Sequence, residues 1–286
     1  MPGRSQWSLA EPQKLTFEEP VTALNVRVVG GTVNVVGAGS GPARLELSGI
    51  EGPPLTVTLK EGTLNVAYED LPWKGFLKWL DRKAWKRSAT VTLTVPAATR
   101  VEVGVVGAGA VVSGISGATD IRGVSGDTTL VGVTGAVRAE TVSGGLEAQS
   151  LGGDLRFNSV SGDLTLIEST GGTVKAESVS GDMLVDLSAT GASPALSLTS
   201  VSGEVAVRLP HPVDAEVDAN TTSGQLSCAF EDLRISGQWG AKRITGTLGA
   251  GGGRLKVTTV SGGVALLRRP PAQDGPADAP APRKVL

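Results

Sequence analysis

The stretch from Val124 to Asp182 repeats one short motif: the sequence reads VSGD at 124–127, VSGG at 142–145, VSGD at 160–163 and VSGD at 179–182. Weaker copies lie midway between these, so that glycines recur every nine residues, at Gly117, Gly126, Gly135, Gly144, Gly153, Gly162 and Gly171. The full repeat is therefore eighteen residues long and consists of two unequal halves.

Each half of the repeat has the pattern of one short strand. After the strong glycines the second and fourth residues are mostly apolar, as in Leu146 and Ala148, or Leu164 and Leu166. This alternation is typical of a strand that buries one face. Glycine can turn the chain at positive φ, so each half is predicted to be a strand followed by a corner.

A single coil of this length cannot bury its own apolar face, but coils stacked about 4.8 Å apart share one dry interior. The sequence therefore predicts an all-β fold, a parallel β-solenoid or single-stranded β-helix with coils of about 18 residues. Turn signals every nine residues do not fit hexapeptide helices, and the GGxGxD motif of calcium-binding rolls does not occur in the sequence. Crossover chirality favours a right-handed coil. Serines that share one coil position are predicted to stack into a structural ladder.

The predicted domain organisation follows from where the regular repeat begins and ends. A cap is expected on physical grounds, because the end of a solenoid exposes unpaired backbone groups. The predicted parts are a lead-in segment at 1–20 anchored by Trp7, a solenoid at 21–269, and a disordered tail at 270–286 that holds five of the sixteen prolines. Within the solenoid we expect irregular first coils or a cap at 21–110, regular coils at 111–207 and looped coils at 208–269.

Residues 71–87 read LPWKGFLKWLDRKAWKR and break the strand pattern. On a helical wheel the apolar residues share one face while most bases lie elsewhere, which predicts an inserted, basic amphipathic helix. Such a segment can lie at an anionic membrane surface or in the groove of a protein partner. The same apolar face could instead serve as a lid on the open end of the solenoid. The candidate binding residues are Trp73, Phe76, Trp79, Lys83, Trp85, Lys86 and Arg87.

The remaining side chains offer little for catalysis. His211, the only histidine, lies between two prolines and is predicted to be a turn residue; neither a GxSxG elbow nor a P-loop is present. Asp127 and Asp163 share a coil position with Asp182, but Gly145 interrupts the row and leaves the first two roughly 9.6 Å apart. Corner residues that favour the turn are the better interpretation. No catalytic residue, cofactor or metal site is predicted.

The composition and net charge limit the classes of partner and the cellular compartment that we expect for this chain. The net charge of −2 argues against a nucleic-acid partner. Cys228 is the only cysteine, which favours a reducing compartment. The sequence shows no signal-peptide core and no apolar run of about 18 residues. A cytoplasmic location is expected, with peripheral membrane contact through 71–87.

The recurring VSG motif, from Val124–Asp127 to Val260–Gly263, with the run Thr94-Val95-Pro96 ahead of it, resembles the toast-rack family of β-strand-repeat proteins. These proteins, a domain of unknown function, are also described as adhesins. The glycine-rich and alanine-rich composition is similar to that of actinobacterial members. The resemblance covers about Val21 to Leu267 and implies a right-handed β-helix without known catalytic residues. Some relatives are linked to envelope stress, in fusions with membrane-spanning or sensor modules.

The function expected from these observations is that of a non-enzymatic scaffold that presents a strand face, and the 71–87 segment, to a protein partner not yet identified. A carbohydrate-binding or polysaccharide-processing β-helix is the alternative. An enzyme of that kind would need Asp, Arg or Lys side chains that converge on one face. Within the coils the nearest approach is the set Asp154, Arg156, Lys175 and Glu177.

Overall fold

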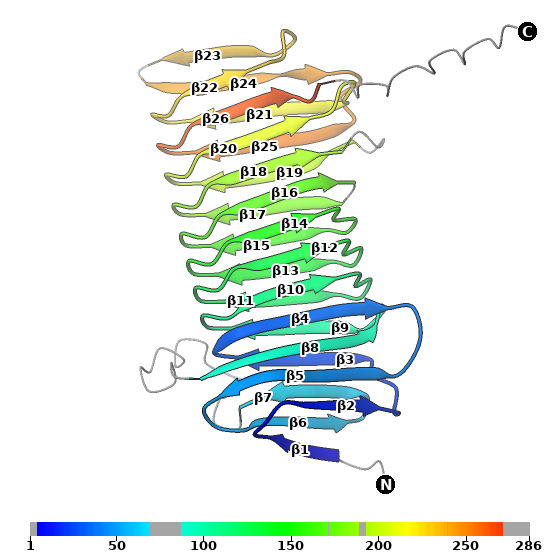
Figure 1. Ribbon diagram of the computed structural model, residues 1–286. Helices are drawn as coiled ribbons and strands as arrows, with labels where there is room; N and C mark the ends of the chain where they lie inside the picture. The colour runs from blue at the N-terminus through cyan, green and yellow to red at the C-terminus, as the bar shows by residue number, and fades with distance from the viewer. Residues whose placement is uncertain (1–4, 69–86, 171, 189–192, 239, 271–286) are drawn as a thin grey trace, which may run out of the picture.

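The protein is an elongated stack of β-strands that form two long sheets, with strand β1 at one end of the stack and strand β23 at the other (Figure 1). The computed structural model describes residues 5–68, 87–170, 172–188, 193–238 and 240–270. Within these ranges the regular elements are 26 strands, of which 14 form sheet A and 12 form sheet B. The predicted helix at 71–87 lies, except for Arg87, outside the described residues.

The strands of each sheet follow one another along the stack. In spatial order sheet A consists of β1 (Ser5–Leu9), β6 (Leu55–Lys60), β7 (Thr63–Ala67), β3 (Ala23–Val28), β9 (Arg100–Val105), β11 (Thr119–Gly123), β13 (Val137–Thr141), β15 (Leu155–Ser159), β17 (Thr173–Ser178), β19 (Ala195–Ser200), β25 (Gly253–Thr259), β21 (Ala215–Thr221), β24 (Ala241–Leu248) and β23 (Arg234–Gln238). Sheet B consists of β2 (Gln13–Phe17), β5 (Ala43–Glu51), β8 (Ser88–Pro96), β4 (Gly30–Ala38), β10 (Gly109–Ser113), β12 (Thr128–Val131), β14 (Leu146–Gln149), β16 (Leu164–Ser169), β18 (Met183–Leu187), β20 (Val205–Leu209), β26 (Val264–Arg268) and β22 (Leu226–Cys228).

The register confirms the eighteen-residue coil. In sheet A Val137 pairs with Leu155, and in sheet B Leu146 pairs with Leu164, in both cases between parallel strands. Each coil therefore contributes one strand to each sheet, and residues eighteen apart lie directly above one another. The all-β, parallel solenoid architecture is thus as predicted, whereas its handedness stays a prediction.

The interior between the sheets is thin and mostly aliphatic. Leu164 and Leu166, the second and fourth residues after a strong glycine, are buried, as the alternation predicted. Phe157 is one of the largest side chains that are completely buried. Small side chains fit this interior because each coil places one strand in each of two sheets that face each other across a narrow space.

The glycines of the VSG motif are required by the close approach of successive coils. A Cβ at Gly144 would lie 2.2 Å from the carbonyl oxygen of Gly126, and a Cβ at Gly162 would lie 2.1 Å from that of Gly144. Neither glycine has a positive φ. The expectation that these glycines turn at positive φ is therefore wrong. The carbonyl group of one coil instead fills the space where a side chain on the next coil would begin.

Antiparallel strands cover the N-terminal end of the stack. Residues 1–20, expected as a lead-in, hold β1 and β2, which pair antiparallel with β6 and β5. The Trp7 ring packs edge-on against Phe17, with 5.4 Å between the ring centroids. These strands satisfy backbone groups that the first parallel coil would otherwise leave unpaired.

The C-terminal coils are stacked out of sequence order. Strand β25 lies between β19 and β21, and β26 lies between β20 and β22. Along the sequence, the β21–β22 coil comes first and the antiparallel hairpin β23–β24 follows it. The last coil, β25–β26, then lies between the β19–β20 coil and the β21–β22 coil. At the corner, Ser261 donates its backbone N–H to Val201, and Ser223 donates to Val260.

Candidate functional site

The exposed serines of the VSG motif form the predicted ladder. Each hydroxyl donates a hydrogen bond to a backbone carbonyl of the preceding coil, at 3.1 Å from Ser143 to Val124 and at 3.3 Å from Ser161 to Val142. The pattern continues at Ser125, Ser180, Ser202, Ser261 and Ser223. These hydroxyls therefore hold neighbouring coils together.

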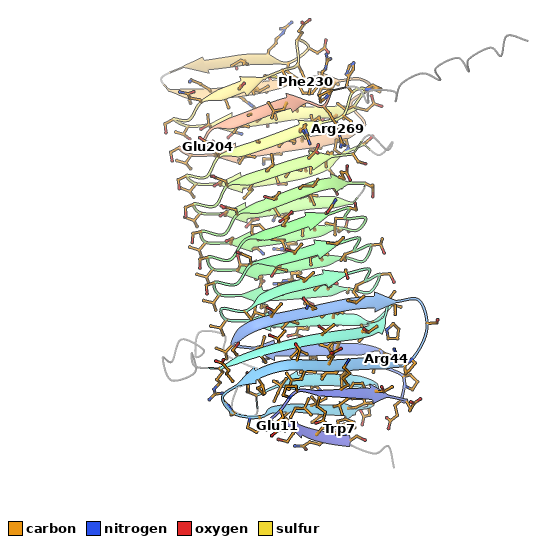
Figure 2. All side chains as sticks on the ribbon, in the orientation of Figure 1. Trp7, Glu11, Arg44, Glu204, Phe230 and Arg269 are labelled. Atoms are coloured by element: carbon orange, nitrogen blue, oxygen red, sulfur yellow. The ribbon has the colours of Figure 1, made fainter. Side chains whose placement is uncertain are left out.

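The corner aspartates also join one coil to the next. The Oδ1 atom of Asp127 accepts a hydrogen bond from the N–H of Gly145 in the next coil. In the same way Asp163 accepts from the N–H of Asp182. Asp182 in turn accepts from the N–H of Glu204, which is labelled in Figure 2. This supports the interpretation of the row as turn residues. Within the described ranges no group of three or more His, Cys, Asp or Glu side chains is arranged to hold a metal ion.

A second polar row, which the sequence reasoning missed, lies on the inner side of the same corner. Gly162 donates its N–H to Ser159 Oγ at 2.7 Å, and Gly181 donates to Ser178 Oγ at 2.9 Å. The equivalent residue is Thr141, Ser200, Thr259 or Thr221 in four other coils, whereas Gly123 takes this position before the first copy of the motif. The signal was present, because Ser or Thr directly precedes these motif copies, so that the motif is better written as [ST]-[VT]-S-G.

Among the predicted binding residues, Trp73, Phe76, Trp79, Lys83, Trp85 and Lys86 lie outside the described residues. Arg87 is described, and its guanidinium carbon lies 5.5 Å from the centroid of the Tyr68 ring. Burial raises the pKa of Tyr68, and the positive charge of Arg87 opposes this shift. The part of the chain that the structure describes contains no helix with the length and apolar character needed to cross a membrane.

The structure separates the remaining candidates from one another. Nδ1 of His211 lies 3.4 Å from the guanidinium of Arg268, and the thiol of Cys228 contacts the backbone of Phe230. The nearest approach to a charged cluster in the coils divides into pairs: Lys175 contacts Glu177 at 2.8 Å, and the carboxylate of Asp154 accepts the N–H of Thr173.

The outer face of sheet A carries most of the charge in the regular coils. Glu102 contacts both Arg27, at 3.3 Å, and Arg122, at 3.2 Å, across neighbouring strands. Burial lowers the pKa of Arg27, while Glu102 opposes that shift. Farther along the face, the hydrogen bond from Lys175 lowers the pKa of Glu177. These side chains neutralise one another.

The outer face of sheet B is nearly neutral. Its outward residues include Val111, Thr129, Val131, Thr165 and Leu184, of which Leu184 is 44% exposed. The two faces of the stack therefore differ in chemistry, because sheet A carries more charged side chains in the regular coils than sheet B does.

A polar depression in the described part of the chain lies on sheet A at its C-terminal end. We call it the terminal groove; its volume is about 820 Å³ and it is open to solvent. Strands β25, β21, β24 and β23 form it together with Thr222. Its lining residues are Asp218, Asn220, Thr221, Thr222, Ser236, Gly237, Ala241, Lys242, Arg243, Lys256 and Thr258.

An ion pair between neighbouring strands lies in the terminal groove. Nε and one terminal nitrogen of Arg243 each lie 2.8 Å from an oxygen of Asp218, which is a bidentate contact. This hydrogen bonding holds the pKa of Asp218 below its ordinary value of 3.8, although burial opposes the shift. It also raises the pKa of Arg243.

Two further cations line the terminal groove. Lys242 and Lys256 form no close ion pair with any other described residue, whereas Asp218 is held by Arg243. Lys256 lies opposite Asp218 on the neighbouring strand, and its positive charge also lowers the pKa of that carboxylate. Beside them, the amide of Asn220 lies 3.5 Å from the hydroxyl of Thr258. The lining thus combines excess positive charge with hydroxyl and amide groups, which suits the binding of a polar, anionic ligand.

The lining contains one carboxylate, Asp218. Glycoside hydrolysis usually uses two carboxyl groups that flank the scissile bond. Because the single carboxylate here is also paired with Arg243, the arrangement fits binding better than acid–base catalysis.

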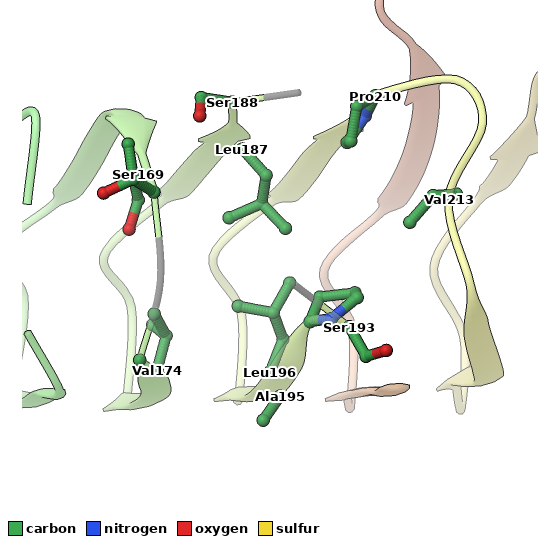
Figure 3. A pocket seen from close by; sticks show the side chains of 12 residues that line it. Ser169, Val174, Leu187, Ser188, Ser193, Ala195, Leu196, Pro210 and Val213 are labelled. Atoms are coloured by element: carbon green, nitrogen blue, oxygen red, sulfur yellow. The ribbon is translucent and has the colours of Figure 1, made fainter. Parts of the chain in front are cut away.

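A second, partly open pocket lies near β18 and β19 (Figure 3). Leu187, Leu196 and Val213 border it, and its volume is about 40 Å³. A space of this size holds about one water molecule, so it is a packing feature and not a ligand site.

Comparison with known proteins identifies the stacked coils. The model of the Toastrack DUF4097 family matches residues 112–193 and 165–267, which together are more than half of the chain. No curated protein matches the sequence.

Two crystal structures are similar at low identity. A candidate adhesin from Bacteroides fragilis is 11% identical, with a TM-score of 0.44, and the match covers 91% of this chain and 98% of that one. A candidate cell adhesion protein from Clostridium sporogenes is 10% identical, with a TM-score of 0.29, and the match covers 91% of this chain and 100% of that one.

Proposed function

The chain belongs to the Toastrack DUF4097 family, and from this premise we propose that it is a non-enzymatic, adhesin-like scaffold that binds a partner through the terminal groove. The rows of serines and aspartates bind neighbouring coils to one another, so they give a rigid support. Rigid strands hold a binding site more precisely than loops do.

The observation that carries this proposal is the excess of cations over carboxylates among the described residues that line an open groove. Elsewhere on sheet A several charged side chains pair with one another, as in Arg122 with Glu102 and Lys175 with Glu177. In the terminal groove Lys242, Arg243 and Lys256 share the single described carboxylate Asp218, so positive charge is left over to bind a ligand. The position at the end of the stack also leaves room for a large partner.

The proposal can be tested by comparing how the unchanged protein and a variant with a blocked groove bind to arrays of immobilised ligands. The protein would be applied to immobilised neutral and acidic glycans, peptides and lipid vesicles. Thr258→Trp places a bulky ring on the outer face of sheet A in the groove, and Thr129→Trp makes the same change at a half-buried position on sheet B. Retention lost only in Thr258→Trp supports the groove, whereas equal retention of both variants contradicts it.

The non-enzymatic part of the proposal needs a separate measurement. Each retained glycan or peptide would be released after prolonged incubation and its mass determined. An unchanged mass is expected for a scaffold. A shortened ligand, with the cleavage removed by Asp218→Asn, would favour the polysaccharide-processing alternative instead.

A further inference from the structure

The charge of the terminal groove is opposite to that of the chain. The described lining residues include three cations, Lys242, Arg243 and Lys256, and one carboxylate, Asp218, which gives them a net charge of +2. The whole chain carries −2. Positive charge is therefore concentrated at this end of sheet A, and a groove lined by one sign of charge raises the local concentration of ligands of the opposite sign.

The cations are spaced across the strands. Lys256 is on β25 and Arg243 is on β24, and β21 lies between these two strands. Two strand spacings are about 10 Å. On β23, Arg234 pairs in register with Thr245, which in turn pairs with Asp218, so a further cation lies in this column of the sheet. A ligand with anionic groups at regular intervals fits this arrangement better than a single small anion does.

The uncharged lining residues favour a sugar over a nucleic acid. Asn220, Thr222, Ser236 and Thr258 supply amide and hydroxyl groups that can exchange hydrogen bonds with ring hydroxyls. Proteins that bind single-stranded nucleic acids usually stack the bases on aromatic side chains. None of the described residues that line the groove is aromatic.

We infer that the terminal groove binds an acidic polysaccharide, whose carboxylates pair with Lys242 and Lys256 while its hydroxyls bind Asn220 and Thr258. This inference rests on the proposed scaffold function and names its ligand. The polymer lies across β25, β21 and β24. Arg243 is held in place by Asp218 and offers its remaining N–H groups to the same chain.

Isothermal titration with polygalacturonic acid tests the inference on the full chain. The groove variant is Lys242→Gln/Lys256→Gln. The control is Arg44→Gln/Arg156→Gln, which removes two exposed cations that form no ion pair with another described residue and lie on β5 and β15. Thermal melting would check that each variant is folded. We expect polygalacturonic acid to bind the groove variant at least about tenfold more weakly and the control within about twofold of the unchanged chain.

Two further ligands separate the outcomes. Dextran supplies neutral sugars and poly-glutamate supplies carboxylates without sugars, and weaker binding of both than of polygalacturonic acid is expected. Equal binding of poly-glutamate, or equal weakening in both double variants, would overturn the acidic-sugar assignment. If the arrays give another ligand whose retention depends on Thr258 while polygalacturonic acid does not bind, the scaffold proposal stands and this inference falls.

Discussion

The backbone N–H of Asp182 donates a hydrogen bond of 2.8 Å to the Oδ1 atom of Asp163 in the coil before it. The side chain of one corner therefore satisfies a backbone donor of the next. Replacement of Asp163 by Ala removes the acceptor and should lower the free energy of unfolding by about 1 kcal/mol. Asp163→Asn keeps an oxygen acceptor and should lose less than half of that. Urea denaturation of both variants measures the difference, and equal losses would contradict a role as acceptor.

The adjacent residues Gly144 and Gly145 should differ sharply in their tolerance of a methyl group. A Cβ at Gly144 would lie 2.2 Å from the Gly126 carbonyl oxygen, whereas a Cβ at Gly145 would have no neighbour closer than 3.5 Å. Gly144→Ala should therefore cost about 3 kcal/mol or more in unfolding free energy, and Gly145→Ala should be close to neutral. Comparable losses at both positions would show that the close approach of coils is not what selects glycine.

Much of this architecture could be predicted because the repeat encodes a local geometry. The eighteen-residue spacing, the buried Leu164 and Leu166, and the stacked serines all follow from one coil placed on another. The reason for glycine in the motif was misjudged. The turn potential of a residue can be read from its type, whereas the position of a carbonyl group in the neighbouring coil cannot.

The order of the last coils and the terminal groove could not be predicted for the same physical reason. Each copy of the VSG motif can pair with any other copy, so the sequence does not say that Val260 lies between Val201 and Thr222. The groove combines Asp218 with Arg243 and Lys256, which are brought together only by this order. The one signal was the increase in charged residues between 214 and 256.

Acid should weaken the link between β21 and β24 through Asp218. Its pKa in the folded protein is held below the ordinary value of 3.8 by Arg243, so the ionised form is favoured by folding. The resulting stabilisation is present above pH 4 and is lost as the pH falls through the lowered pKa. Melting temperatures between pH 5 and pH 2 should fall more steeply for the unchanged chain than for Asp218→Asn. Parallel curves would exclude this pair as a source of the acid sensitivity.

Membrane contact through 71–87 stays a prediction from the sequence. Reversal of three charges in Lys83→Glu/Lys86→Glu/Arg87→Glu should abolish co-sedimentation with anionic liposomes, because each basic residue near such a surface contributes about 1 kcal/mol. Reversal of Lys60, Arg44 and Arg156 serves as the control with the same change in charge. Negligible sedimentation of the unchanged chain would remove the membrane hypothesis and leave a lid as the role of this segment.

Asp186 is a buried carboxylate near the C-terminal end of the stack. Removing its cationic partners should lower the free energy of unfolding more than neutralising Asp186 itself. The side chain of Asp186 is 4% exposed, pairs with Arg208, and lies 3.8 Å from Arg269, which also contacts Glu168. Arg269 follows the last strand and lies near the end of the stack (Figure 2). Asp186 raises the pKa of Arg208 through their hydrogen bond, and the second oxygen of Asp186 has no hydrogen-bond partner among the described residues.

The double variant Arg208→Gln/Arg269→Gln leaves the Asp186 charge buried without a cation and should lose about 3 kcal/mol of unfolding free energy. Asp186→Asn removes the charge itself, and the exposed Arg208 can turn to water, so its loss should be less than half as large. Chemical denaturation at pH 7 measures both variants. The opposite order would mean that the arginines do not compensate a desolvated charge, and that the last strand is held to its neighbours by backbone pairing and apolar contacts alone.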